Sequence, residues 1–175
     1  MIVFLVGFMG CGKSTIGKKL AKKLEVKFID SDNAIEKAAG KSIQEIFDQE
    51  GENEFRRMEL DFLKTFKEEN AVVALGGGTP CDEERLKIIQ EKGEIIYVQM
   101  PPEALCKRLL EAKKVRPLVQ EYKDSPKELL DYIENKLKER SPFYKQANIT
   151  ISGLNISSER LELISKLLSS NQENR

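Results

Sequence analysis

The residues best suited to carry out chemistry form a glycine-rich run near the start of this 175-residue chain. The run, Gly7-Phe8-Met9-Gly10-Cys11-Gly12-Lys13-Ser14-Thr15, fits the pattern G-x-x-x-x-G-K-[ST] and separates an apolar segment from an amphipathic one. Such glycines let backbone N–H groups converge on phosphate oxygens, and a helix that follows directs its positive end at them. In this arrangement Lys13 bridges the β- and γ-phosphates and Ser14 can ligate Mg²⁺. The run therefore predicts a nucleotide-phosphate site.

A plainer interpretation of the same run is a strand-to-helix turn that carries a Lys-Ser pair by chance. The position between an apolar segment and a helical one favours the phosphate site, because the binding mechanism requires that context. We interpret Cys11 inside the run as a small residue where small residues fit, in preference to a redox switch.

Two carboxylates follow the second apolar segment, at Asp30 and Asp32. Ligands of a doubly wound sheet bind beyond the carboxyl ends of its strands, so both side chains are expected at the mouth of one pocket. Asp30 could hold Mg²⁺ through its waters, and Asp32 could accept a hydrogen bond from a substrate hydroxyl. The alternative for Asp32 is a helix cap, since a helix is predicted to start near Asn33.

Glycines and arginines supply the remaining candidates. The third apolar segment ends in Gly76-Gly77-Gly78, where a switch-type nucleotide hydrolase commonly has an aspartate. These glycines could admit a ligand close to the backbone or simply form a flexible turn. Phosphoryl transfer needs cations around the γ-phosphate, and an anionic second substrate needs its own, although each arginine alone is more often a surface charge. The arginines considered are Arg56, Arg57, Arg116 and Arg140.

The elements that must position these residues follow from short apolar runs with helical stretches between them. Near-continuous Val and Ile without clean alternation favours strands that are covered on both faces. The sequence therefore predicts an α/β fold with three α/β/α layers around a five-stranded parallel sheet. The predicted strands are Ile2 to Val6, Lys27 to Ile29, Ala71 to Leu75, Ile95 to Val98 and Ile149 to Ile151.

Helix boundaries are predicted from capping signals. Ser42 with Glu45 forms a capping-box pattern, and the run Ser125-Pro126-Lys127-Glu128 adds proline at the first helical position to the same pattern. Arg140 is predicted at a helix end, before Ser141-Pro142. The last helix should bury an apolar face and fray from Ser169 onward. That face is predicted to contain Leu161, Ile164, Leu167 and Leu168.

Composition narrows the class of protein. The 29 basic and 29 acidic residues cancel, so nothing global attracts nucleic acid or a membrane, and any anion must be held locally. The chain contains no histidine, which excludes a histidine base, a serine triad or a histidine-ligated metal within it. Three widely spaced cysteines predict neither disulfides nor zinc and fit a reducing cytoplasm. We expect one domain over residues 1–175, as a monomer.

In order and spacing these motifs resemble the shikimate kinase family, from Gly7 to about Ala147. A phosphate loop alone is common to many families, whereas the whole set in this order is typical of this one. The matching stretches are Gly7 to Thr15, Asp30-Ser31-Asp32, Gly51-Glu52 with Phe55-Arg56-Arg57 and Glu59, Gly76-Gly77-Gly78, Arg116-Pro117-Leu118, and Glu139-Arg140 with Pro142, Tyr144 and Ala147.

The resemblance implies a P-loop, nucleoside-monophosphate-kinase-like fold and transfer of the γ-phosphoryl group of ATP to the 3-hydroxyl of shikimate, with Mg²⁺ as cofactor. A helical subdomain, about 33–62, would hold shikimate, and a lid, about 112–124, would exclude water. Asp32 would bind the ring hydroxyls and help to activate the 3-hydroxyl. Arg56 and Arg140 would clamp the carboxylate, for which paired guanidinium groups are suited.

The resemblance also completes the set of site residues. The implied catalytic residues are Lys13, Asp32 and Arg116, which would close with the lid over the phosphates, and Gly77 and Gly78 would line the acceptor pocket. The nucleotide-binding set is Gly10, Cys11, Gly12, Lys13, Ser14, Thr15 and Arg116, with the metal held by Ser14 and, through water, Asp30.

Three positions depart from the common pattern of the family. Cys11 replaces alanine or serine, Val119 replaces leucine, and Arg108 is about one residue out of register with the arginine that often covers adenine. The rival interpretations are a gluconate or nucleotide kinase on the same fold and a regulatory module that binds nucleotide without transfer. A mere binder would not need Asp32, Arg116 and both carboxylate clamps together.

Overall fold

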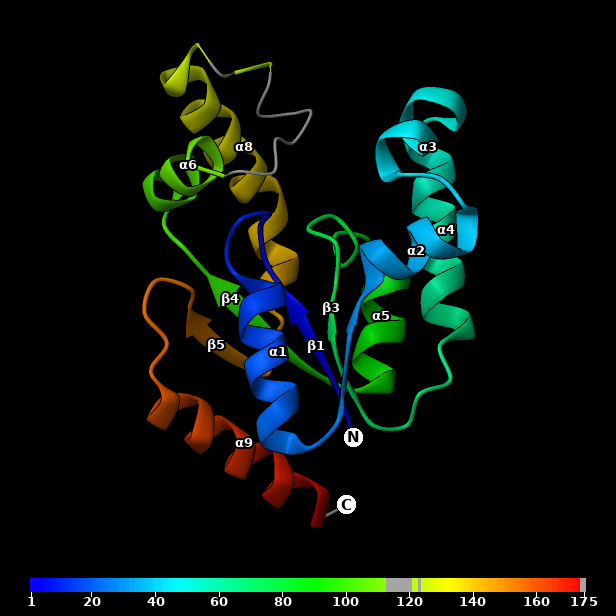
Figure 1. Cartoon of the computed structure of the whole chain (residues 1–175), viewed down its shortest axis with the longest axis vertical. Helices are drawn as coiled ribbons and strands as arrows, with labels where there is room; N and C mark the ends of the chain where they lie inside the picture. The colour runs from blue at the N-terminus through cyan, green and yellow to red at the C-terminus, as the bar shows by residue number, and fades with distance from the viewer. Residues whose placement is uncertain (113–120, 123, 174–175) are drawn as a thin grey trace.

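The computed structural model describes residues 1–112, 121–122 and 124–173 and carries one five-stranded sheet (Figure 1). The strand order is β2-β3-β1-β4-β5, and all neighbours are parallel. The predicted five-stranded parallel sheet is therefore confirmed. The strands are β1 (Ile2–Val6), β2 (Lys27–Asp30), β3 (Ala71–Ala74), β4 (Glu94–Gln99) and β5 (Ile149–Ser152).

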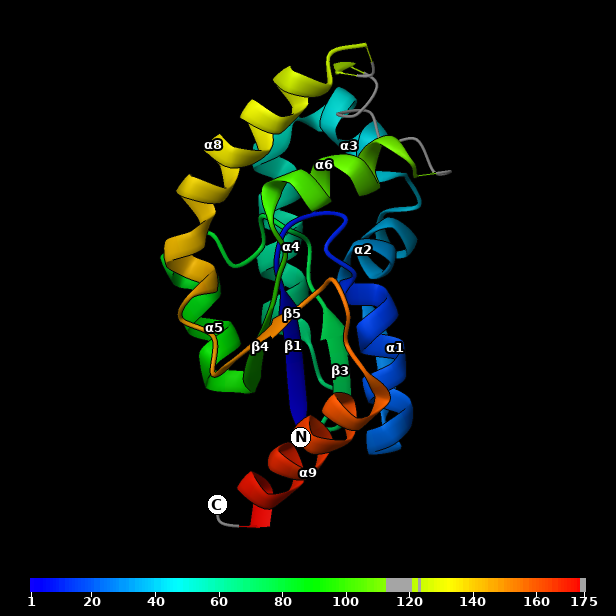
Figure 2. The same cartoon turned by 90° about the vertical axis from the view of Figure 1, so that its left-hand side faces the viewer.

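Helices cover both faces of this sheet, as Figure 2 shows with the strands between α1 and α5. One face packs against α1 and α9, and the other packs against α4, α5 and the last turn of α8. The predicted three-layer arrangement is confirmed. The helices are α1 (Lys13–Leu24), α2 (Ser31–Ala39), α3 (Ile43–Glu50), α4 (Glu52–Thr65), α5 (Glu83–Lys92), α6 (Pro102–Leu110), α8 (Pro126–Tyr144) and α9 (Ser158–Glu173). None of the helices in the described ranges is long and apolar enough to cross a membrane.

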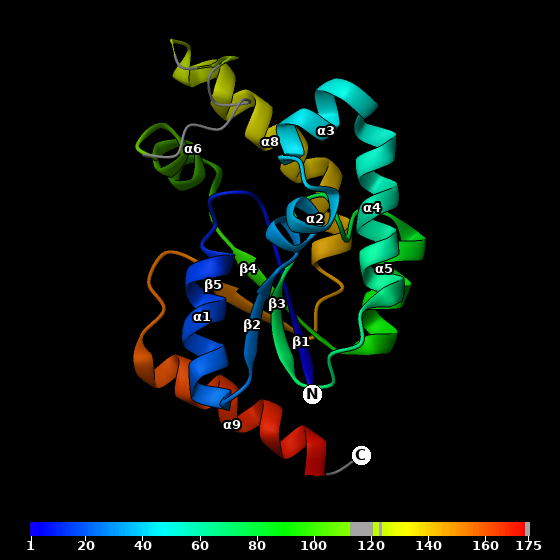
Figure 3. The same ribbon diagram turned by 45° about the vertical axis from the view of Figure 1, so that its right-hand side comes forward.

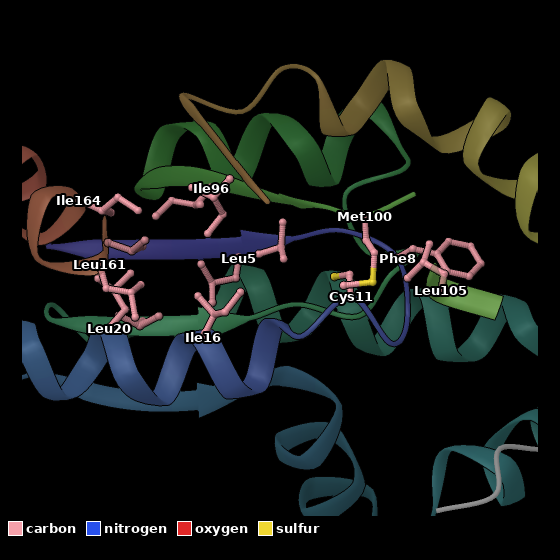
Figure 4. Packing of buried hydrophobic residues seen from close by; sticks show 14 of the residues in the cluster. Leu5, Phe8, Cys11, Ile16, Leu20, Ile96, Met100, Leu105, Leu161 and Ile164 are labelled. Carbon is pink, nitrogen blue, oxygen red and sulfur yellow. The ribbon is translucent and has the colours of Figure 1, made fainter. Parts of the chain in front are cut away.

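Strand β1 shows why the apolar runs are nearly continuous. Val3 and Leu5 join the cluster under α1 and α9, and Phe4 and Val6 join the cluster on the opposite face. Successive side chains of a strand point to opposite faces, so a strand that is covered twice needs apolar residues at every position. Figure 4 shows the first cluster continuing from Leu5 and the α9 side chains to the residues around the phosphate loop.

At the carboxyl edge of the sheet, the connections that follow the neighbouring strands β1 and β3 lead to opposite sides. The connection from β1 runs through α1 to β2, on one side, whereas the connection from β3 runs through α5 to β4, on the other. Such a switch in strand order leaves a crevice beyond the strand ends. The backbone bond from Leu75 N–H to the Leu5 carbonyl (3.0 Å) keeps the segments after β1 and β3 side by side there.

Helices α2, α3 and α4 rise beside this edge and have a small core of their own (Figures 1 and 3). Ile35, Ile46 and Phe55, one from each helix, form a cluster separate from the two that cover the sheet. The predicted capping box at the start of α3 is confirmed, since Ser42 and Glu45 bond reciprocally.

Four predicted helix features are wrong, two in α8 and two in α9. Helix α8 continues past Arg140 and through Pro142 to Tyr144, because proline removes only one backbone donor and the Lys145 N–H again reaches the Ser141 carbonyl (2.9 Å). Ser125 precedes α8 without a side-chain cap bond, since its ψ of 71° is not the extended value that cap residues adopt.

The apolar face and the end of α9 both differ from the predicted ones. Leu161, Ile164 and Leu168 are buried, but Leu167 is 50% exposed. At 3.6 residues per turn, Leu167 lies about a quarter turn away from the centre of the stripe formed by the other three. The helix also continues to Glu173, beyond the fraying predicted from Ser169.

Candidate active site

The glycine-rich run folds into the predicted loop between β1 and α1. Gly7, Gly10 and Gly12 have φ values of 141°, 82° and 102°, which favour glycine, and Gly12 is the N-cap residue of α1. The Lys13 ammonium donates to the carbonyl oxygens of Gly7 (2.8 Å) and Phe8 (3.1 Å). Lys13 is therefore held over its own loop, within reach of an anion bound at the start of α1.

A hydroxyl and a carboxylate meet beside this helix start. Ser14 Oγ donates to Asp30 Oδ2 at 2.8 Å, across the carboxyl ends of β1 and β2. Asp30 is also the N-cap residue of α2, through a long bond from the Asn33 N–H (3.4 Å). Helix α2 starts at Ser31 instead of near Asn33, so the capping role that was considered for Asp32 belongs to Asp30.

Three successive glycines after β3 each face a different candidate residue. A Cβ placed on Gly76 would lie 2.8 Å from Asp32 Oδ1, and one on Gly77 would lie 3.4 Å from a terminal nitrogen of Arg140. A Cβ on Gly78 would lie 2.7 Å from both terminal nitrogens of Arg56. The three candidates come from α2, α4 and α8, so this segment is the point at which they converge.

The same segment borders the phosphate loop. A Cβ on Gly77 would lie 3.5 Å from the carbonyl oxygen of Gly7, which accepts a bond from Lys13 (2.8 Å). The candidates for phosphate binding and for acceptor binding are thus brought together at one edge of the sheet. Lys13, Asp32, Arg56 and Arg140 are all partly exposed, as ligand-binding side chains must be.

Acidic residues hold Arg56 in place. Its guanidinium group donates to buried Glu59 at 2.7 Å and to Glu52 at 2.8 Å, and Glu59 in turn accepts a bond from the Thr79 hydroxyl. Burial lowers the pKa of Arg56, but the carboxylates of Glu59 and Glu52 outweigh this effect and the net shift is upward. The hydrogen bond from Arg56 lowers the pKa of Glu52. Arg56 is therefore a fixed cation in this site.

Arg140 is held differently, by an aromatic face. Its guanidinium carbon lies 5.6 Å from the centre of the Phe8 ring, a residue of the phosphate loop. Near it, Tyr144 donates a hydrogen bond to the Gly77 carbonyl (2.5 Å). The Cys81 thiol lies 3.7 Å from the same carbonyl, and burial raises the pKa of this thiol against the opposing effect of Arg140.

Arg108 lies against the phosphate loop in spite of its register in the sequence. One terminal nitrogen is 3.6 Å from the position of a Cβ on Gly12, and the other donates to the Gly153 carbonyl (3.1 Å). Arg108 therefore connects α6 with the phosphate loop and with the segment between β5 and α9.

Part of the predicted site lies outside the described residues. These are Arg116, with its neighbours Pro117 and Leu118, and most of the predicted lid at 112–124. Two surface hollows of ≈ 460 and ≈ 430 Å³ border α1 and α9, and none of the candidate residues lines either of them.

Sequence reasoning assigned no role to Glu59, Thr79 or Tyr144. For Glu59 a signal existed, because it lies three residues after Arg56 on one helix, within ion-pair reach. Thr79 gave no comparable local signal, since its partner is 20 residues away. Tyr144 belongs to a stretch that carries the family resemblance, but nothing local points to its partner, which is 67 residues away.

Comparisons with known proteins agree on one family. A sequence profile described as "Shikimate kinase" matches residues 9–170. Shikimate kinase from Bacteroides fragilis is 42% identical over 147 residues, which are 83% of this chain and 81% of the relative. The enzyme from Chlorobium phaeobacteroides is 45% identical over 154 residues, 86% of this chain and 80% of the relative.

Solved structures extend the similarity to the fold. Shikimate kinase from Aquifex aeolicus superposes with a TM-score of 0.82 at 35% identity and 98% coverage of both chains. Shikimate kinase from Acinetobacter baumannii in complex with shikimate gives 0.80 at 35% identity, covering 97% of this chain and 93% of that one. A gluconokinase from Sinorhizobium meliloti gives 0.61 at 14% identity over 99% of this chain and 93% of that one, which shows a shared fold alone.

Proposed function

Since this chain belongs to the shikimate kinase family, we propose that the convergence at Gly76-Gly77-Gly78 is its active site. The chain is an ATP-dependent phosphotransferase that passes the γ-phosphoryl group of ATP to the 3-hydroxyl of shikimate, giving shikimate 3-phosphate and ADP.

The phosphates of ATP bind over the start of α1. Residues 10–15 present their backbone N–H groups and the positive end of the helix, and Lys13 leaves the Gly7 and Phe8 carbonyls to bridge the β- and γ-phosphates. Arg108 contributes to the adenine side, because it already lies between the phosphate loop and Gly153. Arg116 is assigned to the phosphates on the pattern of the family alone, together with a lid at 112–124.

The residues present fit Mg²⁺ as cofactor. Ser14 and Asp30 offer a hydroxyl and a carboxylate 2.8 Å apart, and both are the hard oxygen ligands that Mg²⁺ prefers. When bound, Mg²⁺ neutralises charge on the phosphate oxygens. Ser14 would hold the ion directly, and Asp30 would hold it through water.

The acceptor binds on the other side of the glycine segment, in a subdomain at about 33–62. Arg56 and Arg140 clamp the carboxylate of shikimate, since paired guanidinium groups match a planar carboxylate. Asp32 accepts hydrogen bonds from the ring hydroxyls and takes the proton of the 3-hydroxyl as it attacks. Gly77 and Gly78 let the ring approach the backbone closely. The carrying observation is that Asp32, Arg140 and Arg56 each face one of three consecutive glycines.

The test is a coupled assay of ADP release with shikimate, gluconate and nucleoside monophosphates as separate acceptors. We expect turnover with shikimate that exceeds the rate without an acceptor by at least roughly a hundredfold, because closure around the acceptor excludes water. Equal ADP release with and without shikimate would contradict the proposal.

The clamp has a matched control on the same helix. Arg57 is exposed and pairs only with Glu54 and Asp61 in the described structure, so Arg57→Ala should leave the KM for shikimate unaltered. Arg56→Ala should raise that KM by roughly tenfold to a hundredfold, the usual cost of losing a charge-assisted bond. Lys13→Ala should abolish transfer. Equal KM values in the Arg56 and Arg57 variants would reject the clamp role.

We further propose that the protein acts as a monomer in the cytoplasm, without nucleic acid or membrane partners. The balanced charge supports this, as does the burial of most apolar side chains, although Leu163 and Leu167 on α9 are exposed. Light scattering after gel filtration should give a mass near the 19.9 kDa of one chain.

A further inference from the structure

Tyr144 is not one of the proposed ligand-binding residues, although it contacts Gly77 on the acceptor side of the site. Tyr144 is the last residue of α8 and is fully buried. Its ring packs against that of Tyr97, with 5.1 Å between the ring centres. Its hydroxyl donates to the backbone carbonyl of Gly77 at 2.5 Å. A buried hydroxyl with one short bond to a binding loop is a candidate for a positioning role.

The glycine segment needs anchors of this kind. The backbone of glycine is more flexible than that of any other residue, and three successive glycines have no side chains whose packing could fix their conformation. The N–H of Gly76 donates to the buried Ser31 hydroxyl (3.1 Å), and the carbonyl of Gly78 accepts from Cys81 N–H (3.0 Å). Between these two, the Gly77 carbonyl receives Tyr144 and, more weakly, the Cys81 thiol at 3.7 Å. Tyr144 supplies the strong bond at the middle of the segment.

This bond also sets what the segment presents to a ligand. In a trans peptide the Gly78 N–H points away from the Gly77 carbonyl, so a carbonyl fixed toward Tyr144 fixes the N–H on the opposite side. The next Cα is that of Gly78, where the missing side chain leaves room for the Arg56 guanidinium. Rotation of the Gly77–Gly78 peptide would change both the direction of the Gly78 N–H and the room for the Arg56 guanidinium.

The same residue connects the segment with the second clamp. Arg140 precedes Tyr144 by one turn of α8, and one of its terminal nitrogens lies 3.4 Å from the position of a Cβ on Gly77. Holding Tyr144 on Gly77 thus holds the turn that carries Arg140 at a fixed distance from the acceptor pocket.

We propose that Tyr144 is a positioning residue for the acceptor, which acts through the Gly77–Gly78 peptide and through Arg140 without touching the substrate. The inference rests on the proposed function and deepens it. Burial raises the pKa of Tyr144 far above its usual range, so the phenol remains a donor at every pH of interest.

The test compares two variants that each lose one hydroxyl from the same cluster. Tyr144→Phe keeps the ring and removes the bond to Gly77, and Tyr97→Phe is the control because its ring is the stacking partner of Tyr144. Loss of a hydrogen bond to a buried carbonyl should raise the KM and the calorimetric Kd for shikimate roughly tenfold in Tyr144→Phe. The KM for ATP should stay within about twofold in both variants.

A second measurement separates positioning from simple stability. In an Arg140→Lys background, Tyr144→Phe should have a smaller effect on the Kd for shikimate, because the two residues act as a unit. All affinities are measured well below the Tm of each variant. A lower Tm for Tyr144→Phe with an unchanged Kd for shikimate would overturn the inference, as would full additivity with Arg140→Lys.

These outcomes are distinct from a failure of the proposed function. Absence of shikimate-dependent ADP release by the unsubstituted chain would overturn function and inference together. Shikimate-dependent release with equal KM values in Tyr144→Phe and Tyr97→Phe would overturn the inference alone.

Discussion

At the scale of single residues, a methyl group on Gly78 would collide with Arg56, since its Cβ would lie 2.7 Å from both terminal nitrogens. These nitrogens are the far end of a flexible side chain, so Arg56 can move and the fold survives. Gly78→Ala should therefore raise the KM for shikimate at least roughly tenfold, the cost of losing a charge-assisted bond, while the Tm falls by only a few degrees. Steady-state kinetics and thermal melts would measure both.

Gly76 provides the comparison for this prediction. A Cβ on Gly76 would meet Asp32, Thr79 and Glu59 at 2.8, 2.8 and 3.0 Å, and these shorter, buried or partly buried side chains have less freedom to withdraw. Gly76→Ala should accordingly lower the Tm more than Gly78→Ala does. The reverse order of Tm values, or an unaltered KM in Gly78→Ala, would contradict this packing of side chains around the two glycines.

Sequence alone can identify a functional residue when its role depends on a contiguous pattern of neighbouring residues. The nine residues from Gly7 to Thr15 form one contiguous run, and the geometry of the phosphate loop follows from it. Asp30 bonds to Ser14 at the carboxyl edge of the sheet, and the helix cap that the sequence offers as an alternative role for Asp32 is made by Asp30. Tyr144 could not be found in this way, because its partner Gly77 is 67 residues away and only the fold brings the two together.

At the scale of elements, two serines that look alike in sequence should respond differently to mutation. Ser42 closes a reciprocal capping box with Glu45 on α3, whereas Ser125 makes no side-chain cap bond on α8. Ser42→Ala should cost about 1 kcal/mol, or about 2–4 °C in Tm, and Ser125→Ala should cost less than about 0.5 kcal/mol. Chemical denaturation of both variants measures the difference. Equal losses would mean that the backbone around Ser125 permits a cap in solution.

Strands were easier to predict than helix ends for a physical reason. A strand that is buried on both faces leaves an apolar run in the sequence, and the structure places all five predicted strands within about two residues of the expected bounds. A helix end depends on backbone angles and tertiary contacts as well as on residue type. Helix α8 therefore passes through Pro142, because the burial of Tyr144 at its end stabilises a last turn that proline alone disfavours.

At the scale of the whole molecule, the division into layers produces the site. The two faces of the sheet take different helices, so the connections after β1 and β3 diverge and leave their loops adjacent. The small core of α2, α3 and α4 then carries Asp32 and Arg56 on helices that pack mainly on one another. From sequence, the fold class could be predicted because it needs only the order of elements. The meeting of α2, α4 and α8 at the glycine segment depends on packing, so residue patterns alone do not predict it, and only the family resemblance implies it.

The absence of histidine predicts an unusual stability profile for the whole chain. No side chain of this sequence has an ordinary pKa between those of its carboxylates and its cysteines, so the Tm should be nearly constant from about pH 5.5 to 8. Below this range, the carboxylates of Glu45, Glu52 and Glu162 bind protons less readily in the folded chain than in the unfolded chain, because folding lowers their pKa. The largest cause is a side-chain hydrogen bond, with Ser42 at Glu45, with Arg56 at Glu52 and with Lys23 at Glu162. Their contribution is complete above the ordinary value of 4.5 and is lost as the pH falls through the lower folded values.

The alkaline side follows from the opposite shift. Burial raises the pKa of Tyr144, Tyr97 and Cys81, so the folded state holds protons that the unfolded chain releases near the ordinary values of 10.0 for tyrosine and 9.0 for cysteine. Stability is therefore complete below those values and declines above them. Because Tyr144 has the largest of these shifts, Tyr144→Phe should keep a greater share of its neutral-pH stability at about pH 10 than the unsubstituted chain does. Thermal melts by circular dichroism from about pH 3 to 10 would test this, and a steep change of Tm between about pH 6 and 7, or a larger alkaline loss in Tyr144→Phe, would contradict it.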